Sequence, residues 1–502
     1  MEMNRRGFLG MSAAFAAMGL SAGEKKQTKA ELGAAKMRFG VLADVHITGP
    51  VQVPYFERAL RKFEDWKVDA VLACGDLADY GLEQQLKMVA DTWFKVFPNG
   101  KGSDGRPVAN LLHYGDHDMS TWYVDRDEAK AQWPDDAVRK AGLIFNGDRK
   151  AIWERCFKEP WEPIALKTVK GYPFILYHFT RGEKGNESGN GVPGLEEFLK
   201  AHTFDPKKPI FFSQHRIPRG TACGPRAEGS DDGTTTRLFS NYPNLVAFSG
   251  HAHMSGTCEK SIWQGAFTSI QVPSLRYVCT QSGRENGYSC RDRPPRPPVQ
   301  TMPQYPSHTN NIHQGFLCTI YEHALVIRRW EFTHDAALGP DWVIPFDSFK
   351  LPAAERPFNF AVHARTLPVP SFAPDAQVTV AKTKAKNRLN QVRDMIAVSF
   401  PPAVPTADGQ RPEDYEVTLE MDEIDVTKIL SQHRVYSSRL THPTVLDTEP
   451  VVCLIDAAEF PTDKRTLRIL VRPCTVFGQK GEPIILPPEA LEKILGPQKP
   501  AK

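Results

Sequence analysis

Five short segments of the chain combine aspartate and histidine in patterns that could bind metal ions. They are Asp44-Val45-His46, Gly75-Asp76-Leu77-Ala78-Asp79, Gly115-Asp116-His117-Asp118, Gln214-His215 and Gly250-His251-Ala252-His253. Carboxylate oxygens and imidazole nitrogens together suit divalent ions such as Mn²⁺, Fe²⁺ or Zn²⁺. One such fragment is weak evidence, because an ordinary surface or core residue is the better explanation of any single one. Five of them in one chain favour a site for two ions that share a carboxylate.

Each segment follows a short apolar run, which indicates a buried β-strand. The runs are residues 38–43, 70–74, 108–114, 209–213 and 245–249. Runs of about five β-rich residues bounded by glycine or polar turns are typical of buried strands. Residues 56–66 and 82–96, between the first three runs, carry apolar residues at helical spacing. This alternation predicts an α/β fold, in which loops at the carboxyl ends of the strands line the ligand crevice.

In order and in most positions, these blocks resemble the calcineurin-like metallophosphoesterase superfamily over residues 37–352. The family pattern is D-x-H, G-D-x-x-D, G-N-H-[DE], H and G-H-x-H. The resemblance implies a four-layer β-sandwich flanked by helices. It implies that the ligands of one ion are Asp44, His46 and His253. It implies that the ligands of the other ion are Asp116, His215 and His251, with Asp76 bridging both.

The resemblance also implies a reaction, the hydrolysis of a phosphate monoester or diester. Two divalent metal ions would bind the phosphoryl oxygens, and a metal-bridging hydroxide would attack phosphorus. The family's catalytic histidine matches His117, which would contact the phosphate or protonate the leaving oxygen. Asp118 would orient that histidine. The expected substrate is a small or lipid-derived phosphate ester.

Two positions depart from the family pattern. Asp116 stands where the family usually has asparagine, which adds a carboxylate to a normally neutral ligand position. We expect oxygen coordination to survive, with an altered metal preference or lower Lewis acidity. Asp79 stands where purple acid phosphatases carry a metal-binding tyrosine, so a purple colour is not expected. Asp79 is interpreted as a hydrogen-bonding residue rather than a ligand.

Arg216 and Arg219 follow the metal-ligand candidate His215 on the same loop. Arginines there could bind a second phosphate or a substrate carboxylate with two hydrogen bonds, and we take both as candidate substrate-binding residues. The competing interpretation is a solvated or salt-bridged arginine.

Composition limits the classes of function. The chain has 502 residues, 62 Lys and Arg against 59 Asp and Glu, and a net charge of +3. Such a weak balance counts against nucleic acid as a partner and against a nuclease of the same superfamily. With 41% hydrophobic and 24% charged residues a globular core can form, and no apolar run reaches the roughly 18 residues of a membrane span. An exported binding protein with a catalytically weak metal site stays open as an alternative.

The first 23 residues resemble a twin-arginine export signal. Arg5 and Arg6 precede Phe8-Leu9 and a run of small, mildly apolar residues up to Gly23. The expected partner during export is the twin-arginine translocase, and the expected location is periplasmic or secreted. An ordinary helix start or an uncleaved anchor is the alternative.

The rest of the chain divides into a linker and two domains. We expect a linker at 24–36, the metal-binding domain at 37–352 and a Pro-rich linker at 353–373. Strand-like runs at 395–400, 415–419, 451–455 and 467–471 then predict a smaller all-β sandwich at 374–490, followed by a tail at 491–502. This sandwich resembles a fibronectin type III domain. The nine cysteines have no CxxC spacing. We expect most of them to be buried free thiols, and a disulfide between Cys279 and Cys290 is the alternative for that pair in an oxidising compartment.

Overall fold

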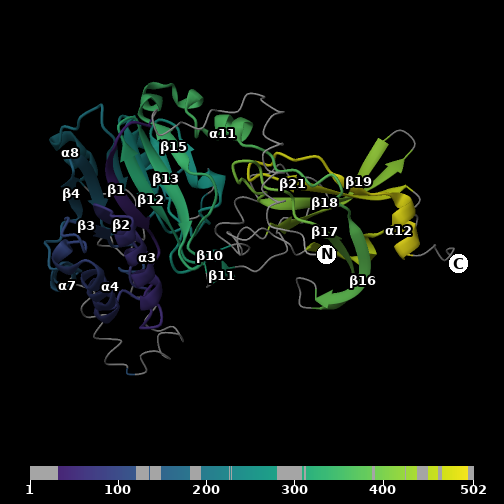
Figure 1. Ribbon diagram of the computed structural model, residues 1–502, viewed down its shortest axis with the longest axis horizontal. Helices are drawn as coiled ribbons and strands as arrows, with labels where there is room; N and C mark the ends of the chain where they lie inside the picture. The colour runs from purple at the N-terminus through teal and green to yellow at the C-terminus, as the bar shows by residue number, and fades with distance from the viewer. Residues whose placement is uncertain are drawn as a thin grey trace, which may run out of the picture.

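A computed structural model describes most of the chain. The described residues are 32–119, 135, 149–180, 194–224, 227, 229–279, 308–309, 312–386, 391–423, 426–437, 450–461 and 466–495. The expected export signal at residues 1–23 and the side chains of Cys279 and Cys290 lie outside them, so export and that bridge stay predictions. Figure 1 shows an α/β unit and a unit of β-strands side by side.

The first sheet of the α/β unit is mixed. It has seven strands in the order β14-β13-β12-β1-β2-β3, with β15 paired to β13. The strands are β1 (Ala35–Leu42), β2 (Ala70–Cys74), β3 (Ala109–His113), β12 (Gln314–Tyr321), β13 (Ala324–Glu331), β14 (Ala336–Ala337) and β15 (Trp342–Pro345). β1, β2 and β3 run parallel, and β12 joins β1 antiparallel. The carboxyl ends of the three parallel strands therefore lie at one edge.

The second sheet has six strands in the order β4-β5-β6-β7-β9-β8. They are β4 (Ile164–Val169), β5 (Tyr172–Tyr177), β6 (Ile210–Ser213), β7 (Leu245–Ser249), β8 (Ile262–Gln264) and β9 (Thr268–Gln271). β5, β6, β7 and β9 are parallel. A separate short pair joins β10 (Val278–Cys279) to β11 (His308–Thr309).

Helices cover the outer faces of both sheets and give the unit four layers. Phe39 of β1 packs edge-on against Phe174 and Phe211 of the second sheet, within one buried cluster that joins the two sheets. The first sheet is covered by α3 (Val53–Asp65), α4 (Glu83–Val96) and α7 (Arg149–Phe157). The second is covered by α8 (Leu195–Ala201) and α9 (Thr234–Phe239). The predicted α/β sandwich flanked by helices is therefore confirmed.

The C-terminal unit is an all-β domain of two antiparallel sheets, as predicted. Its strands are β16 (Thr379–Lys386), β17 (Val392–Phe400), β18 (Asp414–Glu423), β19 (Val426–Tyr436), β20 (Val451–Asp456), β21 (Leu467–Cys474) and β22 (Ile484–Leu486). The sheet orders are β16-β17-β20 and β19-β18-β21-β22. Alternate residues of β18, such as Val417 and Leu419, enter the core with the closing helix α12 (Pro488–Leu495). The fibronectin type III likeness stays a prediction.

The helix α11 (Phe360–Thr366) lies in the predicted linker between the two units. Within the described residues, no helix combines the length and the apolar character needed to cross a membrane. The seven cysteines whose side chains are described are buried, and no disulfide joins any two of them.

Candidate dinuclear metal centre

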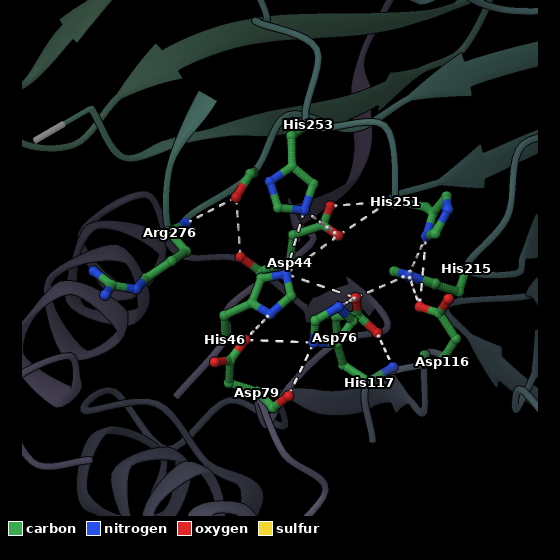
Figure 2. A network of polar contacts seen from close by, with 12 residues as sticks. Asp44, His46, Asp76, Asp79, Asp116, His117, His215, His251, His253 and Arg276 are labelled. Carbon is green, nitrogen blue, oxygen red and sulfur yellow. Dashed lines mark hydrogen bonds and ion pairs between the residues drawn. The ribbon is translucent and has the colours of Figure 1, made fainter. Parts of the chain in front are cut away.

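All five predicted segments lie directly after strands and meet between the two sheets. Asp44 and His46 follow β1, Asp76 follows β2, and Asp116 follows β3. His215 follows β6 of the second sheet, and the pair His251 and His253 follows β7. Because these strands are parallel within each sheet, their carboxyl ends deliver the side chains to one place (Figure 2).

One group of converging side chains comprises Asp44, His46 and His253. Each offers a ligand atom within 4.8 Å of the others. Nε2 of His253 lies 3.2 Å from Oδ1 of Asp44 and 3.3 Å from Nε2 of His46. All three residues are buried. Three lone-pair donors directed at one point form a set that suits a divalent cation.

A second group comprises Asp76, Asp116, His215 and His251. Nε2 of His215 lies 3.1 Å from both Oδ2 of Asp76 and Oδ1 of Asp116. Nδ1 of His251 lies 3.2 Å from Nε2 of His215. Oδ1 of Asp116 is buried and also lies 3.5 Å from Nδ1 of His251. A buried carboxylate oxygen beside two imidazole nitrogens suits a bound cation.

Asp76 stands between the two groups. Its Oδ2 lies 3.1 Å from Nε2 of His215 in the second group and 3.6 Å from Nε2 of His46 in the first. Figure 2 shows its carboxylate between the imidazoles of both groups. The geometry agrees with the expected bridging position, and the residues present fit two divalent ions.

Hydrogen bonds on the far ring nitrogens orient two of the histidines. Nδ1 of His46 lies 2.8 Å from Oδ1 of Asp79, and Nδ1 of His215 lies 2.8 Å from the carbonyl oxygen of Cys74. Both partners are acceptors, so each Nδ1 carries the proton. The lone pair on Nε2 of each ring therefore faces the site. Metal-binding histidines usually have such a hydrogen-bond acceptor on the other ring nitrogen, and it fixes the orientation of the ring.

The backbone at the site is strained. Five of the seven ligand candidates have positive φ angles, between 46° and 71°: Asp44, His46, Asp76, His251 and His253. Such conformations are uncommon for residues other than glycine and cost on the order of 1–3 kcal/mol each unless the surroundings enforce them. Gly115 allows the loops to pack, because a Cβ there would lie 2.2 Å from Oδ1 of Asp76. Strain gathered at one site is typical of functional loops.

His117 lies beside this centre, but its orienting partner differs from the prediction. Its Nδ1 is 2.9 Å from the carbonyl oxygen of Asp79 and 3.4 Å from Oδ1 of the same residue. Asp118 instead accepts hydrogen bonds from the backbone N–H groups of Leu77, Ala78 and Gly115. Asp118 therefore holds together two loops that carry ligand candidates, and Asp79 orients His117. Asp79 hydrogen-bonds as interpreted from the sequence, although its link to His117 was missed.

The electrostatics of the site favour added positive charge. Burial opposes ionisation of Asp44 and Asp116, but neighbouring imidazoles outweigh burial and lower the pKa of both carboxyl groups. Burial likewise opposes protonation of His215, yet the carboxylates of Asp76 and Asp116 raise its pKa well above the usual value. The pKa of His117 is raised to about 9, because Asp76 and Asp79 outweigh its burial. Protons on the imidazoles thus balance the carboxylate charge, and bound metal cations could balance it instead.

The two arginine candidates separate in the structure. Nη2 of Arg216 lies 3.4 Å from Oδ2 of Asp116, and its guanidinium carbon lies 5.4 Å from the centre of the Phe179 ring. Arg219 is exposed, and its side chain lies near Gly233 rather than the ligand candidates. The structure therefore brings only Arg216 to the centre.

Sequence reasoning missed one aromatic neighbour of the site. The ring of Tyr277 lies 4.4 Å from that of His253 and 6.0 Å from that of His46. It follows β9 in a segment without a recognisable pattern. Only its place in the fold identifies it.

The residues of this site fall within a match to a known protein family. Residues 37–255 match the family model of the calcineurin-like phosphoesterases, and all seven ligand candidates lie within the match. No curated protein sequence matches the chain. Among solved structures, a dimetal phosphatase from Danio rerio is similar with 11% identity and a TM-score of 0.35, covering 62% of this chain and 100% of that one. A purple acid phosphatase from yellow lupin, Lupinus luteus, has 13% identity and a TM-score of 0.37, covering 62% and 54%.

Proposed function

We propose that the calcineurin-like phosphoesterase domain of this chain hydrolyses a phosphate monoester or diester. The observation that supports this most is the convergence of seven ligand candidates on two adjacent positions, with Asp76 between them. Divalent ions held there would polarise a phosphoryl oxygen and activate water. Asp44, His46 and His253 would hold one ion, and Asp116, His215 and His251 the other.

His117 would supply the proton that the leaving oxygen needs. Its pKa is raised to about 9, because Asp76 and Asp79 outweigh its burial. Asp79 accepts from its Nδ1 and so leaves Nε2 to donate. A binding protein would need the ligands but no proton donor, which is why the placement of His117 favours catalysis over the binding alternative.

Reconstitution tests the proposal. Protein stripped with a chelator and loaded with Mn²⁺ should hydrolyse a chromogenic phosphodiester or monoester. Asp76→Asn should lower turnover on the order of 10³-fold and reduce bound Mn²⁺, because it removes the shared carboxylate charge. His117→Ala should lower kcat about 10²- to 10⁴-fold and keep the metal.

Asp91→Asn provides the matched control, because Asp91 pairs with Lys87 on the exposed surface of α4. It should keep the turnover and metal content of the original protein. Full turnover with two bound ions in Asp76→Asn would contradict the dinuclear assignment.

A further inference from the structure

Asp116 uses its two oxygens in different directions. Oδ1 faces the ligand candidates, 3.1 Å from Nε2 of His215 and 3.5 Å from Nδ1 of His251. Oδ2 faces the guanidinium of Arg216, with 3.4 Å between Oδ2 and Nη2. A carboxylate shared in this way can offer one oxygen to a metal ion while the other accepts from an arginine.

An asparagine at this position would have a carbonyl oxygen for the metal and an amide group as a donor. Aspartate keeps the oxygen but loses the donor and adds a negative charge. Arg216 supplies both missing properties at the same place, since its guanidinium is a permanent cation with five N–H donors. An asparagine amide beside this guanidinium would instead place two donor groups face to face.

The position of Arg216 is fixed and its donors are not all used. The backbone carbonyl of Arg216 accepts from Gln214 at 2.7 Å, and the guanidinium lies over the ring of Phe179. Its Nε has no acceptor among the described residues. That Nε is buried, whereas the side chain as a whole is 15% exposed.

Resting on the proposed function, we propose that Asp116 and Arg216 act as one unit in place of a neutral amide. In this unit Asp116 binds metal and Arg216 donates to an oxygen of the substrate phosphate. Arg216 also offsets the charge of Asp116, so the centre keeps its attraction for an anion. Arg216 is thus a specificity-determining residue for the phosphoryl group. Its contribution to phosphate affinity depends on the presence of Asp116.

A double-variant cycle tests this unit through binding, independently of turnover. The probe is inorganic phosphate, and its affinity for the Mn²⁺-loaded protein is measured by calorimetry. Arg216→Gln should weaken phosphate binding about 10-fold or more, because a donor and a cation are lost. Asp116→Asn added to Arg216→Gln should restore the affinity to within about threefold, because the amide then donates unopposed. Arg219→Gln removes the same charge from the same loop and should show no coupling to Asp116→Asn.

Other outcomes overturn the proposal. If the double variant binds phosphate as weakly as Arg216→Gln, Arg216 contacts phosphate without Asp116 as its partner. If Arg216→Gln changes nothing, the arginine has no role at the site.

A metal-free measurement separates this proposal from the proposed function. If the original protein binds no Mn²⁺, the proposed function fails, and the pair is then judged from thermal unfolding of the metal-free variants. The pair predicts a coupling between the two substitutions of about 2 °C or more in Tm. If the change in Tm of the double variant equals the sum of the changes in the two single variants, Asp116 and Arg216 do not act as a unit.

Discussion

His215 illustrates how a buried histidine is prepared for a metal ion. Its Nδ1 donates to the carbonyl oxygen of Cys74, so only Nε2 can bind metal. Without metal, the carboxylates of Asp76 and Asp116 keep that nitrogen protonated, because they raise its pKa well above the usual value. A metal ion and a proton would therefore compete for the lone pair on Nε2 of His215.

This competition predicts proton release on metal binding. At pH 7, Mn²⁺ should displace about one proton from His215 per chain, and the apparent affinity should rise with pH. Calorimetry in two buffers of different ionisation enthalpy measures the released protons directly. His215→Ala should abolish this release, whereas His202→Ala, a substitution outside the centre, should not. Binding without proton release in the original protein would contradict the assignment.

The same groups set a pH dependence for the metal-free protein. A histidine whose pKa is raised on folding stabilises the protein below its unfolded pKa, near 6.5, and loses that contribution as pH rises through the folded value. For His117 the folded value is about 9. The Tm of the metal-free protein should therefore fall between about pH 6.5 and 9. In metal-loaded protein this fall should be smaller, because cations held by Asp76 and Asp116 would offset part of the negative charge that raises the pKa of His117.

At the residue scale, sequence reasoning found the ligand candidates but not their support. Asp44, His46 and the other candidates stand in ordered blocks after strands, which is a pattern of sequence. The contact of Asp79 with His117 and of Arg216 with Asp116 joins residues 38 and 100 positions apart. Such contacts depend on loop shape, which no local pattern records.

Among the elements, a short 3₁₀-helix, η2 (Glu259–Ser261), ties the loop after β7, which carries the ligand candidates His251 and His253, to the other sheet. Oε1 of Glu259 accepts from Arg329 of β13 at 2.8 Å. Its Oε2 accepts from Trp342 of β15 at 2.8 Å and lies 3.1 Å from Nε2 of His363 in α11. Glu259, Arg329 and Trp342 are buried, so this carboxylate is the junction of three elements.

Breaking this junction should destabilise the α/β unit. Glu259→Gln leaves Arg329 buried without its counter-charge, which should cost roughly 3–5 kcal/mol and lower Tm. Adding Arg329→Met should recover part of the loss, because the orphaned charge is then removed. Glu322→Gln, at an exposed pair with Lys36, is the control and should change stability by less than about 1 kcal/mol. An unchanged Tm in Glu259→Gln would contradict this role.

The junction also predicts acid sensitivity. Burial opposes ionisation of Glu259, but Arg329 and His363 outweigh it and lower its pKa to about 2 from a usual value of 4.5. A lowered pKa contributes stability above the unfolded value and loses it as pH falls through the folded value. Stability should therefore decline between about pH 4.5 and 2, and Glu259→Gln should flatten that decline in a melting series.

Element prediction succeeded for several buried strands of uniform character, although the largely buried strand β5 was missed. Residues 70–74 and 245–249 were predicted with the observed bounds, because continuous apolar runs mark central parallel strands. β4 and β16 were missed. Their burial is intermediate or exposed along much of their length, and lysines at alternate positions of β16 hide the pattern. Edge strands of this kind are defined by their partners rather than by their own sequence.

At the scale of the whole molecule, the two-unit layout was predictable but its docking was not. A proline-rich segment and a change from α/β to all-β patterning marked the layout. The docking instead depends on a turn after β21, where Val476 joins a buried cluster of the α/β unit. The other members are Ile217, Ala222, Cys223, Ala227, Ala252, Met254 and Cys258.

That cluster lies against the strained loop after β7 that carries two of the ligand candidates. Ala252 stands between His251 and His253, both of which have positive φ angles. The next residue of the turn, Phe477, packs against the ring of His363 at 5.4 Å between centroids. Since strained backbone persists only where packing enforces it, the β unit helps to hold the ligand loop in shape.

Removing that packing should therefore weaken metal binding as well as stability. Val476→Ala should cost roughly 1–3 kcal/mol, because it leaves a small cavity, and should weaken Mn²⁺ binding several-fold as the loop relaxes. Val452→Ala makes the same change at a 44% exposed position of the β unit and should alter neither quantity. Calorimetric Mn²⁺ titration beside thermal unfolding separates the two effects. Lower stability with unchanged Mn²⁺ affinity would show that the β unit packs on the loop without shaping the metal centre.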